Sequence, residues 1–184
     1  MAQQMPVRNY RISKDLFDAI ENEFKTETIA KKYLESKDPN LFKEHGKKLM
    51  EKTYELGSKP EYSDRIYELI QMAGKDTGGE VIFPHVPQRF IEIAYLSVHF
   101  MGILRVRVNN MKELTFTVDE KHCGIYGHLK EGLSEDELKA LPCKDSCLTA
   151  VNRIFELLKM DDVSVSQTEK MPEKGVCTFC AQNQ

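Results

Sequence analysis

All five cysteines of this 184-residue chain lie in its last third, and their type and spacing are the clearest indication of chemistry in the sequence. They are Cys123, Cys143, Cys147, Cys177 and Cys180. A buried cysteine behaves as a small apolar side chain, so cysteines that serve packing alone should be scattered over all the apolar segments. The clustering therefore favours a chemical role, and five reduced, inert thiols are the alternative.

Two spacings suggest a metal centre. Cys143 and Cys147 are four residues apart at the start of an expected helix, which places both on one face. Cys177 and Cys180 form a C-x-x-C pair, a spacing that lets two thiolates reach one metal ion. The chain must bend there, because a regular strand would point the two side chains to opposite faces. We expect Cys123, Cys177 and Cys180 to share a metal with either Cys143 or Cys147.

The spacing leaves the identity of the metal open, because tetrahedral zinc and a 4Fe-4S cluster both take four cysteines. Zinc is our first expectation and the iron–sulfur cluster is the alternative. A disulfide framework is disfavoured, because the number of cysteines is odd and no secretory signal opens the chain. Catalytic residues stay unassigned: His122 is adjacent to Cys123, but neighbours on an extended chain face apart.

Composition places the chain among soluble globular proteins, with 41% apolar and 30% charged residues. We expect one domain over 1–184, with a helical layer in 1–75 and an apolar helix, a sheet and the cysteine-rich lobe in 80–184. The net charge of −3 and the pI near 6.0 argue against nucleic-acid binding. No apolar run is long enough to span a membrane and no targeting segment is evident, so a cytoplasmic location is expected.

Apolar residues at helical spacing predict the helices that must support the cysteines. Such helices follow Ser13, run from Pro39 to Gly57, and cover 62–73. These helices carry more large apolar residues than a thin layer covering a sheet needs. We therefore expect a symmetric homodimer that buries part of the following set: Phe17, Phe24, Tyr33, Leu34 and Phe42.

The helix predicted over Phe90–Phe100 is apolar on most sides, so it should be buried between the sheet and the other helices. Ligand cavities tend to occur at such junctions. We therefore expect a pocket for a small apolar molecule lined by Phe90, Ala94, Val98, His99 and Phe116. A fully packed core is the alternative.

Alternating residues predict the strands. Positions 106–108 and 114–118 alternate on either side of Asn109-Asn110, whose tolerance of positive φ suits a hairpin turn. A short extended piece is expected at 81–83. Further strands are expected at 163–165 and 176–180. Between the two pairs of strands, Ser134 and Glu137 form a capping box that predicts a short helix, and a longer helix is expected over 143–158. Helices segregated from strands indicate an α+β fold, with an antiparallel sheet of about four strands covered by helices.

The carboxyl-terminal pattern resembles the 4-vinyl-reductase-like, or hydrocarbon-binding, domain superfamily. An apolar helix, a strand, a glycine-containing turn and a cysteine in an extended segment follow one another here as Leu148–Leu158, Val163–Val165, Pro172–Gly175 and Cys177–Phe179. Relatives of 2-amino-thiazoline-4-carboxylate hydrolase show a similar arrangement, to which Cys123 and Cys143 correspond. The resemblance implies a fold like that of the TRAPP vesicle-tethering subunits, often dimeric. It also implies binding of small apolar molecules, and in some members a cysteine-bound zinc.

Two function hypotheses follow. The first is a non-enzymatic domain that binds or senses a small apolar ligand and carries a cysteine-ligated metal centre. The alternative is a metal- or thiolate-dependent enzyme, a hydrolase or reductase acting on a small molecule. A closed four-cysteine site would support the first, and three ligands with an open position would support the second.

Overall fold

The computed structural model describes residues 13–76, 85–99, 105–110 and 112–184, and the extended piece expected at 81–83 lies outside them. Eight helices and four strands occur in these residues. The elements in chain order are α1 (Lys14–Glu23), α2 (Thr26–Ser36), α3 (Asn40–Gly57), α4 (Pro60–Asp76), α5 (His85–Val98), β1 (Arg105–Asn109), β2 (Glu113–Asp119), α6 (Gly124–Lys130), α7 (Glu135–Lys139), α8 (Lys144–Leu157), β3 (Val163–Glu169) and β4 (Val176–Asn183).

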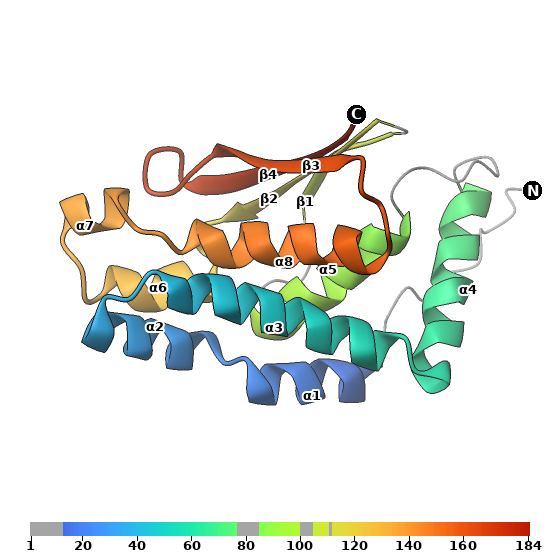
Figure 1. Ribbon diagram of the computed structural model, residues 1–184, viewed down its shortest axis with the longest axis horizontal. Helices are drawn as coiled ribbons and strands as arrows, with labels where there is room; N and C mark the ends of the chain where they lie inside the picture. Colours follow the sequence, from blue (N-terminus) through green and yellow to red (C-terminus); the bar gives the residue numbers. More distant parts are fainter. Residues whose placement is uncertain (1–12, 77–84, 100–104, 111) are drawn as a thin grey trace, which may run out of the picture.

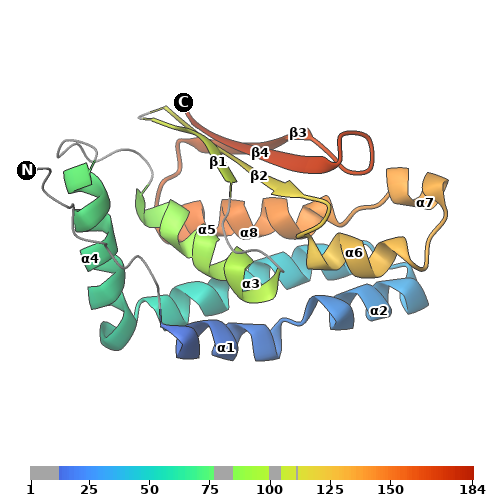
Figure 2. The ribbon, with the colours of Figure 1, turned by 180° about the vertical axis from the view of Figure 1, so that it is seen from behind.

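The strands form one antiparallel sheet in the order β1-β2-β4-β3, which confirms the α+β prediction. All the described helices lie on one side of this sheet, and no described helix covers its other face (Figure 1). Helices α5 and α8 lie directly against the sheet, and α1, α2 and α3 form a further layer behind them, as the opposite view also shows (Figure 2). The sheet therefore has one face that can contribute to a core.

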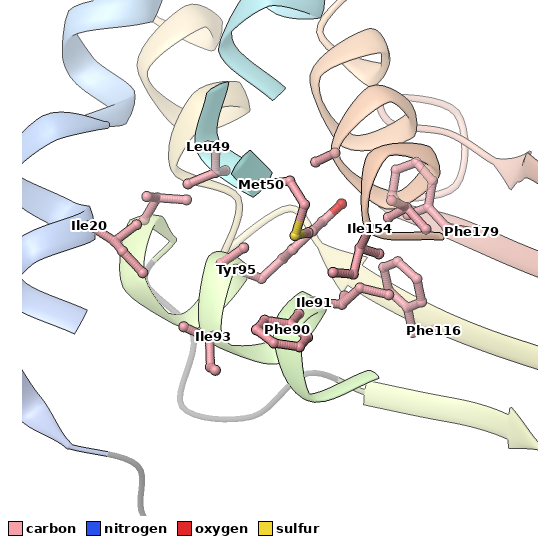
Figure 3. Close-up of a cluster of buried hydrophobic side chains, with 14 of the residues drawn as sticks. Ile20, Leu49, Met50, Phe90, Ile91, Ile93, Tyr95, Phe116, Ile154 and Phe179 are labelled. Atoms are coloured by element: carbon pink, nitrogen blue, oxygen red, sulfur yellow. The ribbon is translucent and has the colours of Figure 1, made fainter. Parts of the chain in front are cut away.

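Alternation along the two central strands sets that core. Phe116 of β2 and Phe179 of β4 are paired across the strands, point to the helices, and stack with ring centroids 5.4 Å apart. Tyr95 of α5 meets Phe116 edge to face at 5.7 Å. Figure 3 shows these rings between the sheet, α5 and α8, with apolar side chains of α1 and α3 completing the cluster. Aromatic pairs of this geometry add to the stabilisation from burial.

Helices α3 and α8 approach each other closely at Gly46. A Cβ atom at this position would lie 2.0 Å from the carbonyl oxygen of Ser146, so only glycine allows this separation of the two backbones. Beside it, His45 Nδ1 and Ser146 Oγ are 3.0 Å apart and share a hydrogen bond. The contact fixes the first turns of α8, which carry two of the cysteines.

The hairpin between β1 and β2 turns in a different way from the one expected. Neither asparagine adopts a positive φ; Asn109 ends β1, and the Oδ1 atom of Asn110 accepts hydrogen bonds from the backbone N–H groups of Lys112 and Glu113 at 2.9 and 3.0 Å. The side chain of Asn110 thus stabilises the turn.

The apolar residues that led to the homodimer prediction pack inside the chain. Phe24 and Phe42 are buried, and Phe17, Tyr33 and Leu34 are partly buried against the two larger apolar clusters. They do not form an exposed apolar surface, and the dimer stays a prediction.

Candidate metal centre

Four of the five cysteines line one pocket, although they come from three separate parts of the chain. Cys123 immediately precedes α6, Cys143 immediately precedes α8, Cys147 lies in the first turns of α8, and Cys177 lies near the start of β4. Cys143 and Cys147 both face this pocket, as their four-residue spacing predicted.

The fifth cysteine is placed elsewhere. Strand β4 pairs with β2 without a break from Val176 to Gln182, so Cys177 points to the helices with Phe179, while Cys180 points to the opposite face of the sheet. Cys180 pairs across the strands with Thr115 and Ser166 and is 6% exposed. The structure therefore brings both Cys143 and Cys147 to the site and leaves Cys180 out, because the chain does not bend at the C-x-x-C pair.

The pocket walls combine apolar and basic residues. Its apolar lining is contributed by Val118, Ile125, Tyr126, Leu138, Leu141, Met171 and Phe179. Every charged residue of the lining is a lysine, namely Lys139, Lys144 and Lys170, and each of these is exposed. Two of these lysines are paired with carboxylates, Lys139 with Asp136 at 3.6 Å and Lys170 with Glu173 at 3.1 Å.

The cavity among the thiols is small, at about 30 Å³ of space open to the centre of a water molecule. Pockets for drug-sized molecules measure roughly 300–1,000 Å³. The sulfurs surround this space without converging on one point: among the described residues, no three His, Cys, Asp or Glu side chains stand close enough to hold a metal ion as placed.

Burial keeps the thiols protonated at neutral pH. Burial raises the pKa of Cys123 to about 12, and the backbone N–H groups of Tyr126 and Ile125 oppose this only in part. Burial and the neighbouring cysteines raise the pKa of Cys143 well above its usual value, and those of Cys147 and Cys177 are also raised, mainly by burial. Free thiols with raised pKa values are poor nucleophiles, which argues against a free-thiolate enzyme.

The histidine beside Cys123 is paired with a carboxylate. His122 Nδ1 lies 2.5 Å from Asp119 Oδ1, and Asp119 also pairs with Arg105 at 3.2 Å. This agrees with the expectation that His122 is a poor base for Cys123.

The five residues expected to line a ligand pocket are packed in the core instead. Phe90, Ala94, Val98 and Phe116 belong to the largest apolar cluster, and His99 is 8% exposed. The N–H of Gly124 donates to His99 Nδ1 at 3.1 Å, and burial lowers the pKa of this histidine to about 4. His99 is thus a neutral structural residue at the start of α6.

No protein-family model, curated protein or solved structure matches the chain. The resemblance to the 4-vinyl-reductase-like superfamily therefore stays a prediction.

Among the described residues, no helix has both the length and the apolarity needed to cross a bilayer.

Two site residues were not foreseen from the sequence. Tyr95 on α5 lies beside Cys147, and Gln167 on β3 lines the pocket near Cys177. The signal for Gln167 was available, because it follows Val163 and Val165 at the two-residue period of the helix-facing side of the sheet, where a polar side chain is unusual. Tyr95 gave no such signal within its apolar helix.

Proposed function

We propose that this protein is a metal-binding domain whose centre is formed by Cys123, Cys143, Cys147 and Cys177. The observation that carries this proposal is the meeting of four thiols from three parts of the chain around one small cavity. Four soft sulfur donors form the set that zinc takes in closed structural sites, with Zn–S distances of about 2.3 Å. The sulfurs must move inward to reach such distances.

Zinc fits this cavity better than a 4Fe-4S cluster does. A cavity of about 30 Å³ has room for a single ion once the sulfurs close on it, whereas a cluster of eight iron and sulfide atoms needs more room. The bound ion would replace the four thiol protons, and the lysines at the mouth would offset the net charge of −2 of one Zn²⁺ with four thiolates. The iron–sulfur cluster is the second candidate.

The apolar part of the lining gives a place for the small-molecule ligand of the binding hypothesis. We assign this ligand to the mouth of the same pocket, where Leu138, Leu141 and Met171 line the wall beside the thiols. This position replaces the one expected around Ala94, where packed side chains fill the space. A closed set of four thiolates beside such a wall fits a binding or sensing domain and leaves no coordination position open for catalysis.

Metal analysis of protein purified without oxygen tests the centre. We expect one equivalent of zinc and a colourless protein, whereas broad absorption near ~400 nm would identify the iron–sulfur alternative. Serine substitutions at Cys123, Cys143, Cys147 and Cys177 should each lower the metal content.

The matched control is Cys180→Ser, which removes a thiol from the same strand but from the opposite face. It should keep full metal content. Loss of metal in this variant together with retention in Cys143→Ser or Cys147→Ser would contradict the assignment, as would a wild-type protein that takes up neither zinc nor iron.

A further inference from the structure

Two buried hydrogen-bond donors stand beside the four thiols without a partner of their own. The first is the hydroxyl group of Tyr95, a residue that is 1% exposed. Its side chain extends from α5 toward α8, with the oxygen at the far end of the ring (Figure 3). Among the described residues, the hydroxyl has no hydrogen-bond partner of good geometry, and the polar group next to it is the thiol of Cys147.

The second donor is the side-chain amide of Gln167. This residue pairs with Phe179 across the β3–β4 ladder, so Cys177, two residues before Phe179, is its diagonal neighbour on the same face. Gln167 lines the cysteine pocket, and its Nε2 atom is buried without a good partner among the described residues.

Buried donors without partners are rare in folded proteins, and each one requires an explanation. A neutral thiol is a weak acceptor, whereas a thiolate is a strong one. Each donor would therefore gain a full partner if its neighbouring sulfur became an anion. Two donors on different elements, each beside a different cysteine of the same pocket, point to a common cause.

We propose that Tyr95 and Gln167 are positioning residues that donate hydrogen bonds to the thiolates of Cys147 and Cys177 when the centre is loaded. The proposal rests on the metal-binding function above. Donors of this kind orient metal ligands and reduce the electron density that sulfur gives to the metal.

Packing alone does not account for the Tyr95 hydroxyl. The ring of Tyr95 contacts Phe116 and His99, at centroid distances of 5.7 and 5.4 Å, and a phenylalanine would keep both contacts. Substitution by phenylalanine therefore removes only the donor, and leucine at position 167 removes the amide at nearly constant size.

The test uses the full chain loaded with Co²⁺, whose sulfur-to-metal charge-transfer band reports on the thiolates. We expect Tyr95→Phe and Gln167→Leu to bind one Co²⁺, to shift this band to lower energy, and to weaken Co²⁺ binding at pH 7 by about tenfold each. The controls are Tyr54→Phe on α3 and Gln182→Leu on β4, whose side chains do not line this pocket. An unchanged band and affinity in both variants would overturn the proposal.

A wild-type protein that takes up no Co²⁺ would refute the metal function, and the two donors are then tested in the metal-free protein. Mass spectrometry after iodoacetamide treatment at several pH values gives the alkylation rate of each cysteine. Tyr95→Phe should slow alkylation of Cys147 at least threefold and leave Cys123 unchanged, and Gln167→Leu should do the same to Cys177. Rates equal to those of the wild type would refute the donor role independently of any metal.

Discussion

Replacement of Gly46 by alanine tests how closely the cysteine site depends on the contact between α3 and α8. The added Cβ would lie 2.0 Å from the Ser146 carbonyl oxygen, and ordinary contact begins at 3.4 Å, so the two backbones must separate locally by about 1.4 Å. Neither atom belongs to a flexible side chain that could rotate away. The strain therefore falls on the helix pair itself.

The expected loss of stability follows from two opposing effects. Overpacking at a site without room costs up to about 3 kcal/mol, while alanine recovers about 1 kcal/mol of helix propensity relative to glycine. We expect Gly46→Ala to lower the free energy of unfolding by about 2 kcal/mol. Because Ser146 lies between Cys143 and Cys147, a shift of this size also exceeds the roughly 0.2 Å tolerance of metal–ligand distances, so metal affinity should fall.

Urea unfolding of the metal-free protein measures the first effect, and competition with a chromophoric chelator measures the second. The matched control is Gly127→Ala in α6, where an added Cβ would meet nothing within 4 Å. This variant should be as stable as the wild type or more stable, by up to about 1 kcal/mol. If Gly46→Ala unfolds within 0.5 kcal/mol of the wild type, or Gly127→Ala loses as much, the close approach of α3 and α8 has been misjudged.

Three further outcomes are expected. Zinc binding must displace thiol protons, because burial raises the pKa of Cys123 to about 12. Chelator competition should therefore show that the affinity for zinc rises by about tenfold or more per pH unit between pH 6 and 8. An affinity that does not change with pH would mean that the thiols are already ionised. Burial lowers the pKa values of His45 and His99 from 6.5 to about 4, so both add stability above pH 6.5 that is lost as the pH falls toward 4. Urea unfolding should accordingly show that the free energy of unfolding is about 2 kcal/mol lower at pH 5 than at pH 7 for each histidine. If His99→Asn loses as much stability between pH 7 and pH 5 as the wild type does, His99 is not a source of this loss. Ala94→Phe should destabilise the protein by about 1–3 kcal/mol because Ala94 is fully buried, whereas unchanged thermal unfolding would reveal a cavity at this position.

Local signals in the sequence predicted the parts of the fold that depend on local physics. The capping box of Ser134 and Glu137 forms as expected, with the Ser134 side chain accepting from the N–H of Glu137. Alternation identified β2 because its helix-facing residues, Leu114, Phe116 and Val118, are all buried. In both cases a few neighbouring residues suffice to define the structure.

Helix α6 was missed because tertiary contacts override its local preferences. Two glycines in seven residues disfavour a helix. Gly124 is needed there, since a Cβ would lie 2.6 Å from Thr26 Oγ1 of α2. Such a close approach between segments almost 100 residues apart leaves no periodic signal in the sequence.

The sequence predicted that Cys123, Cys177 and one of Cys143 and Cys147 lie together, and these thiols do line one pocket. It also assigned Cys180 to the site, whereas the structure places Cys180 on the opposite face of the sheet. The metal stays a prediction. A C-x-x-C pair serves one metal only when the backbone bends, and unbroken pairing with β2 from Cys177 to Cys180 keeps β4 extended there. The pocket expected around Ala94 is filled by side chains, and the sequence could not show this. Periodicity shows which residues of Phe90–Phe100 are buried, but not whether the space they face is filled. Cavities depend on side-chain packing across several elements, which no single segment encodes.

The order of the sheet has a consequence for biosynthesis. Strand β4 is made after β1, β2 and β3, yet it lies between β2 and β3 and carries Cys177. During translation, Cys123, Cys143 and Cys147 are therefore produced before Cys177, and the 30 residues from Cys147 to Cys177 take roughly 1.5–6 s to synthesise. In that interval the nascent chain holds three thiols in an open site that a thiophilic ion or an oxidant can reach. Insertion of β4 closes the site, so under the proposed function the yield of metal-loaded protein should depend on the supply of metal and on the redox state of the cell while the chain is still being made.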